Sequence, residues 1–185
     1  MLERQDIASA STPVKIVHAS TQLSIPFLIT ISRDLHFGSA QVMGDETYKS
    51  IYGALDKIIK IYRHYGFSVT HILGDGQFEF LDPRKIMSGV TLNIVTRGEH
   101  VPEVERYIRT VKERTRSVYN SLPFKRFPTK LIAEIVYAQI FWLNSFPSDN
   151  GLSRTQSPHV LVTGTGVDYN LHCRLECGSY VQTHE

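Results

Sequence analysis

The chain is organised around residues 68–79, which read SVTHILGDGQFE. The β-branched and apolar residues from Val69 to Leu73 predict a buried strand, because such side chains fill a covered, pleated surface well. The strand ends in Gly-Asp-Gly, and the two glycines permit a sharp turn that leaves Asp75 at the carboxyl end of the strand. Clefts in sheet proteins often open at such ends, where a carboxylate can bind a metal ion. The alternative is a turn aspartate that hydrogen-bonds its own backbone.

The segments around this strand alternate between two hydrophobic periods. Alternating or continuous apolar runs predict strands at 14–18, 25–32, 36–42, 69–73 and 90–95. Apolar residues at three- and four-residue steps predict helices over 45–65, from 102 onward and over 131–143, with a short broken helix over 78–87. Short loops between the first three strands predict an antiparallel meander, and the first helix predicts that the fourth strand lies parallel to its neighbour.

This order of elements predicts an α/β fold with the ribonuclease-H-like layout, a mixed five-stranded sheet flanked by helices. A chain of 185 residues suits one domain. We expect a loose leader over residues 1–13, a core domain over 14–147 and an irregular appended tail over 148–185. The tail is predicted from its Gly-, Ser- and Pro-rich composition.

Composition excludes several classes of protein. No apolar run approaches the ~20 residues that cross a bilayer, and the charged first residues lack the apolar segment of a secretory signal. The two cysteines, Cys173 and Cys177, do not make a disulfide framework, which favours a reducing compartment. With His172 they provide too few ligands for a tetrahedral zinc site.

Positive charge is concentrated in one part of the chain. Residues 97–130 contain nine Lys or Arg against four Asp or Glu, a local excess of five positive charges in a chain whose formal net charge is +2. Within the long helix, four charged residues share one face at four-, three- and four-residue steps: Glu105, Arg109, Lys112 and Arg116. Such a field can attract polyanions. The alternative is an ordinary solvated helix face.

Several short stretches, taken in order, resemble the integrase core of copia-type retrotransposons. They are IPFLITISR (25–33), GDGQFE (74–79), EHVPEVER (99–106), VKER (111–114), LPFKR (122–126), WLNSFP (142–147), SP (157–158) and GSYV (178–181). The resemblance covers most of the chain from about residue 14 onward. Their order and spacing, more than any single motif, carry it.

This resemblance implies metal-dependent DNA strand transfer and 3′-end processing. In that family three carboxylates hold two divalent ions, Mg²⁺ or Mn²⁺, which activate an attacking oxygen and stabilise a leaving one. Asp75 resembles the second aspartate of the family and Glu105 resembles its glutamate, while Arg109, Lys112 and Arg116 would contact DNA phosphates. The alternative for Glu105 is a surface ion pair with Arg109, worth ~0.2–0.5 kcal/mol.

The first aspartate of the family has no counterpart at the aligned position, which falls at or beside His18. A neutral imidazole suits magnesium poorly and removes one negative charge, so we expect weakened metal binding and impaired catalysis. The alternative is that His18 is simply a strand histidine. The upstream zinc-binding module of the family also has no counterpart, so we expect a core and tail from a truncated or decayed element.

The resemblance further implies homo-oligomers that bind element ends and target DNA, no membrane partner, and a location in the nucleus or in a cytoplasmic element particle. Two other functions remain open from the sequence. One is a catalytically inactive domain that keeps the fold for self-association or partner binding. The other is an unrelated ribonuclease-H-like nuclease with a different acidic set.

Overall fold

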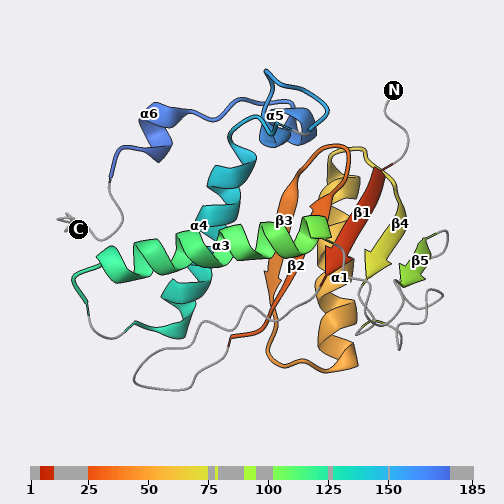
Figure 1. Ribbon diagram of the computed structural model, residues 1–185, viewed down its shortest axis with the longest axis horizontal. Coiled ribbons are helices and arrows are strands. Elements are labelled where there is room, and N and C mark those ends of the chain that lie inside the picture. Colours follow the sequence, from red (N-terminus) through yellow and green to blue (C-terminus); the bar gives the residue numbers. More distant parts are fainter. Residues whose placement is uncertain are drawn as a thin grey trace.

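The computed structural model describes residues 25–74, 78, 90–94, 102–124, 127–149 and 151–175, together with the backbone of residues 5–10. Its strands form one mixed sheet in the order β3-β2-β1-β4-β5 (Figure 1). They are β1 (Gln5–Ala10), β2 (Phe27–Ser32), β3 (Gly38–Val42), β4 (Val69–Gly74) and β5 (Thr91–Ile94). β1 lies in the centre, antiparallel to β2 and parallel to β4. The predicted antiparallel pairing of the second and third strands and the predicted parallel fourth strand are confirmed, whereas the first strand of the observed meander is residues 5–10.

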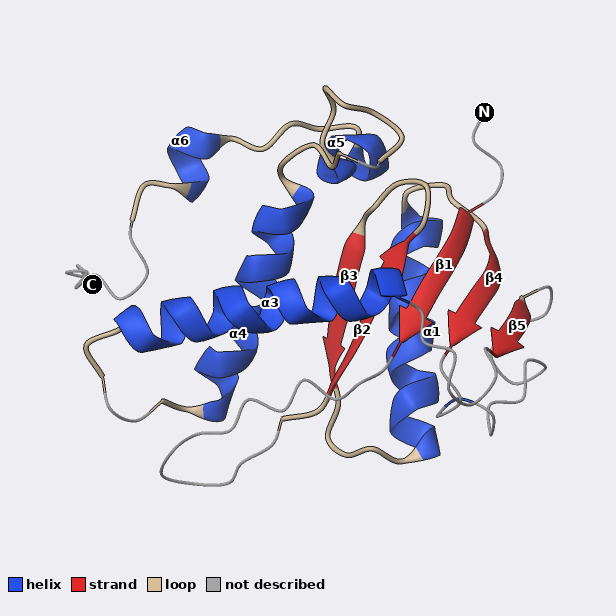
Figure 2. Ribbon diagram, viewed as in Figure 1, coloured by secondary structure: helices blue, strands red, loops and turns tan. Residues whose placement is uncertain are grey.

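Helices cover both faces of this sheet, which confirms the predicted α/β class (Figure 2). They are α1 (Tyr48–His64), α3 (Pro102–Ser121), α4 (Thr129–Asn144), α5 (Pro158–Thr163) and α6 (Tyr169–His172). β2 supplies both cores through its alternation: Leu28 packs with α1, whereas Phe27 and Ile29 pack with α3 and α4. None of the helices in the described ranges is long and apolar enough to span a membrane.

The start of α1 follows from its capping residues. Thr47 accepts a hydrogen bond from the Ser50 backbone N–H, and the carboxylate of Asp45 accepts from the hydroxyls of Ser50 and Thr47. These hydrogen bonds, that from Ser50 foremost, hold the pKa of Asp45 below its ordinary value. At the other end of the helix, Gly66 adopts a φ of 82°, a conformation that glycine tolerates best. The helix predicted from this pattern is confirmed.

α4 runs along β3, the strand at one edge of the sheet. Asn144 accepts a hydrogen bond from the Gly38 N–H and donates one to the Gly38 carbonyl, both at 2.8 Å. Two turns earlier, the Tyr137 hydroxyl accepts from the Val42 N–H at 3.0 Å. Side chains of one helix thus pair with backbone groups at both ends of β3.

Two predictions about the ends of the chain are wrong. Residues 5–10 of the expected loose leader form β1, since they pair on one side with β2 and on the other with β4. The tail is not irregular throughout, because it contains α5 and α6. Val162 of α5 is buried in the core on the α1 side, so the described part of the tail packs against the domain. A boundary at residue 147 stays a prediction.

Some predicted elements lie outside the described residues. They are the strand at 14–18 and all of the short helix at 78–87 except Phe78. Phe78 is buried, and a Cβ built on Gly74 would lie only 3.0 Å from its ring. Gly74 at the end of β4 therefore leaves space for this aromatic side chain.

Candidate functional site

The carboxyl ends of β1 and β4 lie at the same edge of the sheet because these two strands are parallel. Asp75 directly follows the last residue of β4, Gly74, but it lies outside the described residues. Its placement at the strand end therefore stays a prediction. Its distance from Glu105 stays a prediction.

Glu105 lies in the first turn of α3, and its side chain is exposed. Val104 beside it is fully buried, and α3 contacts β1 and β2 (Figure 1). The buried positions of α3, Val104, Ile108, Val111 and Thr115, recur at four- and three-residue steps and fix how the helix lies on the sheet. Glu105 thus lies at the start of a helix that contacts the central strand, and its side chain is exposed.

The predicted set of three acidic metal ligands has no carboxylate at its first position. His18 lies outside the described residues. The described first strand instead contains Asp6, which is in register with His71 of β4. His71 is three residues before Gly74, so Asp6 is about 10 Å from that strand end at ~3.3 Å per residue. The part of β1 that lies nearest the strand end contains Ala8, Ser9 and Ala10, and these residues offer no carboxylate.

Within the described ranges, no three or more His, Cys, Asp or Glu side chains form a cluster that could hold a metal ion. Asp75 and the side chains of β1 lie outside these ranges, so the metal-binding pair of Asp75 and Glu105 stays a prediction. Cys173 is exposed and not in a disulfide, and Cys177 lies outside the described residues.

Glu105 and the three predicted basic residues lie together on one side of α3, which we call the basic flank: Glu105, Arg109, Lys112 and Arg116. At 100° per residue they fall within an arc of about 60°. Arg109 and Arg116 are exposed, whereas Lys112 is half-buried. Burial lowers the pKa of Lys112, and the charge of Arg116 lowers it further. The negative charge of a nearby phosphate would oppose both effects, because it favours the charged form of the amine.

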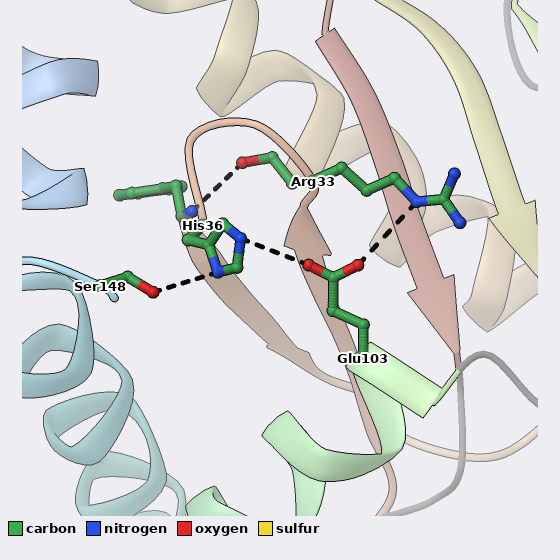
Figure 3. A network of polar contacts seen from close by, with 6 residues as sticks. Arg33, His36, Glu103 and Ser148 are labelled. Atoms are coloured by element: carbon green, nitrogen blue, oxygen red, sulfur yellow. Dashed lines mark hydrogen bonds and ion pairs between the residues drawn. The ribbon is translucent and has the colours of Figure 1, made fainter. Parts of the chain in front are cut away.

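A second polar cluster connects the start of α3 with two distant loops (Figure 3). The carboxylate of Glu103 lies 3.5 Å from Nε2 of His36 and 3.9 Å from Nε of Arg33, both in the β2–β3 turn. Nδ1 of His36 lies 3.2 Å from Oγ of Ser148, after α4. His36 has a φ of 52°, which is unusual for a residue other than glycine. Sequence analysis missed this cluster, since its members are scattered and match no motif.

No protein-family model and no curated protein matches this chain. Among solved structures, the catalytic core domain of BIV integrase is similar, at 14% identity and a TM-score of 0.60 over 91% of this chain and 97% of that chain. The HTLV-2 integrase catalytic core domain in complex with magnesium, in its dimeric form, gives 15% identity and a TM-score of 0.62 over 86% of this chain and 99% of that chain.

A third similar structure is a simian T-cell lymphotropic virus intasome in complex with a PP2A regulatory subunit. It gives 14% identity and a TM-score of 0.63, and the match covers 86% of this chain and 54% of that chain. Identities this low establish the fold alone. The chain therefore has the fold of retroviral integrase catalytic core domains, while the copia type stays a prediction.

Proposed function

We propose that the chain is an integrase-core-like domain of a copia-type element, which binds DNA and has impaired strand-transfer chemistry. The observation that supports this most is the fold, because the match spans 97% and 99% of two integrase catalytic cores. The exposed carboxylate of Glu105 lies on the same flank of α3 as the cations Arg109, Lys112 and Arg116. A metal ligand and phosphate-binding groups would thus lie side by side on one helix.

The residues on this flank fit a hard divalent cation in part. Glu105 offers oxygen donors, which Mg²⁺ and Mn²⁺ prefer, and Asp75 would add a second carboxylate. A bound ion would act as a Lewis acid toward a phosphodiester oxygen. Glu105 and Asp75 would hold it, while Arg109, Lys112 and Arg116 would orient the DNA backbone. With no carboxylate at the carboxyl end of β1, we propose that a second ion binds poorly.

The oligomeric part of the proposal rests on the similar structures. One HTLV-2 core is described as dimeric, another as trimeric, and the simian viral protein is part of an intasome. We propose that this chain also forms homo-oligomers on DNA, in the nucleus or in an element particle.

The sharpest test compares two glutamates of the same helical turn. Glu105→Gln removes the charge from the basic flank, and Glu103→Gln removes it two residues away on the other side of α3. Manganese titrations should show affinity lowered at least tenfold, or about 1.4 kcal/mol, by Glu105→Gln and little changed by Glu103→Gln. Equal losses in both variants would exclude Glu105 as a ligand.

A parallel assay tests the missing carboxylate. We expect little magnesium-dependent nicking of element-end DNA by the chain as it stands, and stronger metal binding by His18→Asp if His18 marks the lost position. Robust activity of the unmodified chain would overturn the proposal of impaired chemistry. Nicking without preference for element-end DNA would favour the unrelated-nuclease alternative.

A catalytically inactive interaction domain is the second candidate, and exposed apolar side chains favour it. Phe146, which follows α4, is 52% exposed, and two residues of α6 are also exposed, Tyr169 at 46% and Leu171 at 67%. Surfaces of this kind commonly mark protein contacts. Self-association without any affinity for DNA or divalent metal would support this candidate over the first.

A further inference from the structure

A cavity of about 390 Å³ opens on the side of α3 away from the basic flank. The β2–β3 turn, the end of α4 and the loop that follows α4 form its other walls. The cluster of Glu103, His36 and Ser148 lines it and joins these elements. Its volume falls within the range of ~300–1,000 Å³ that is typical of small-ligand sites.

One wall of the cavity is cationic. Arg106, Thr110 and Arg114 line it at four-residue steps along α3. Both arginine side chains are exposed, and neither forms an ion pair with any residue of the described ranges. The hydroxyl of Thr110 donates to the Arg106 carbonyl, so the guanidinium groups are the available donors. Guanidinium groups bind phosphate through paired hydrogen bonds.

The cavity also contains two carboxylates, and they differ in their surroundings. Glu103 already contacts Arg33 and His36. Asp149 forms no ion pair within the described residues, and it also lines an adjacent cavity with Arg154. Asp149 is therefore the carboxylate of this cavity whose charge no ion pair within the described residues offsets. Removing the charge of Asp149 should strengthen anion binding, whereas removing an arginine should weaken it.

Another part of the lining is apolar and aromatic. It contains Leu143, Phe146 and Pro147. Phe146 is 52% exposed, and its ring is stacked near Trp142, at 6.5 Å between centroids and an interplanar angle of 29°. A nucleobase can stack on an exposed aromatic ring of this kind regardless of its identity.

We propose that this cavity binds one nucleotide, with its phosphate at Arg106 and Arg114 and its base against Phe146. The choice of a nucleotide as the class of ligand rests on the proposed function. The site itself is separate, because the cavity lies on the other flank of α3. The nucleotide comes either from solution or from the unpaired end of a DNA strand. A concave site of this size can hold one nucleotide but not duplex DNA, so we expect duplex DNA to bind at the basic flank.

The chain contains a built-in reporter for this test, because Trp142 is its single tryptophan and is stacked near Phe146. Titration with deoxyadenosine monophosphate should change Trp142 fluorescence in a saturable way. Arg106→Ala and Arg114→Ala should each weaken binding about tenfold, as expected for one charge-assisted contact. Asp149→Asn should tighten it. Arg63→Ala, on α1, should leave it unchanged, and thermal melts check that each variant is folded.

Two further titrations identify the source of the nucleotide. A duplex with an unpaired 5′ end that binds more tightly than both the free nucleotide and a blunt duplex indicates a strand end. A free nucleotide that binds as tightly as the overhang indicates a soluble ligand. No saturable binding of either, or the same loss with Arg63→Ala as with Arg106→Ala, overturns the inference. If nucleotide binding fails but blunt-duplex binding persists, this inference is wrong and the proposed function stands. If nucleotide binding persists but duplex binding is absent, the proposed function is wrong and this inference stands.

Discussion

The two flanks of α3 carry similar charged residues in different surroundings. On the basic flank, Glu105, Arg109 and Arg116 are exposed along the helix. On the other flank, which we call the pocket flank, Glu103 contacts the β2–β3 turn, and Arg106 and Arg114 face a cavity. The sequence of the helix alone does not distinguish these sides. The contacts of α4 and of the β2–β3 turn decide which side can bind an extended polyanion and which can enclose a small one.

The largest effect on stability should come from filling the space between Gly38 of β3 and Tyr107 of α3. A Cβ built on Gly38 would lie 1.9 Å from the Tyr107 hydroxyl oxygen and 2.3 Å from its Cζ. Gly38→Ala should therefore lower the free energy of unfolding by about 3 kcal/mol, as overpacking does. The measurement is denaturant unfolding.

Gly53→Ala is the matched control, because no atom lies within 4 Å of a Cβ built there. Gly53 is an exposed residue inside α1, so alanine should raise stability by about 0.5–1 kcal/mol. A Gly38→Ala variant as stable as the parent would mean that Tyr107 does not pack tightly on β3.

The second effect separates the flanks by their response to salt. Replacing Arg109, Lys112 and Arg116 together by alanine should reduce the log–log salt slope of duplex binding by ~2.7, since each phosphate contact contributes ~0.9. The loss should be the same for any DNA sequence. Replacing Arg106 and Arg114 should change this slope by less than one contact. Equal changes in the two variants would remove the distinction between the flanks.

The third effect concerns the half-buried Lys112. Its pKa is lowered by burial and by the charge of Arg116. Between the lowered pKa and the ordinary value near 10.4, Lys112 is protonated to a greater extent in the unfolded chain than in the folded chain. This group therefore makes the free energy of unfolding rise with pH in that window. The folded chain offers more unprotonated amine, and an amine-acylating reagent should modify Lys112 faster than the exposed Lys57. DNA should protect Lys112 and leave Lys57 unprotected, as mass spectrometry can measure.

The smallest effect is expected at Tyr107. Its hydroxyl is buried without a hydrogen-bond partner in the described residues, and burial raises its pKa. Tyr107→Phe should therefore change stability by less than about 1 kcal/mol, and removal of an unpaired polar group favours a gain. Tyr62→Phe is the contrast, since the Tyr62 hydroxyl donates to the Phe37 carbonyl at 3.1 Å and its loss should cost about 1 kcal/mol. A larger loss at Tyr107 would reveal a partner for its hydroxyl.

The elements that sequence predicted well are those with strong local patterns. α1 has an apolar stripe, the Thr47 cap and Gly66 beyond its end, and β4 is a run of β-branched and apolar residues. The basic flank was also predictable, since helical spacing fixes which residues of α3 share a side. These signals are local, and the structure preserves them.

The parts that sequence missed depend on pairing between distant segments. β1 reads QDIASA, whose small and polar residues have weak strand preference, and its neighbours on both sides hold it in the sheet. The contact between His36 and Ser148 joins residues 112 positions apart. For α5, local signals existed: Ser157 caps it, Pro158 begins it and Gly164 ends it, but a helix of six residues is too short for periodicity to reveal.

The hydrogen bonds from α4 to β3 have a consequence for assembly. An open edge strand is a template on which another chain can add a strand, which leads to sheet extension and aggregation. Asn144 and Tyr137 occupy backbone groups of Gly38 and Val42 that such a strand would need. These three backbone groups are therefore unavailable to an added strand, which disfavours association of copies of the chain by strand addition at this edge. Asn144→Ala would uncover both Gly38 groups and make β3 a site for unwanted strand addition.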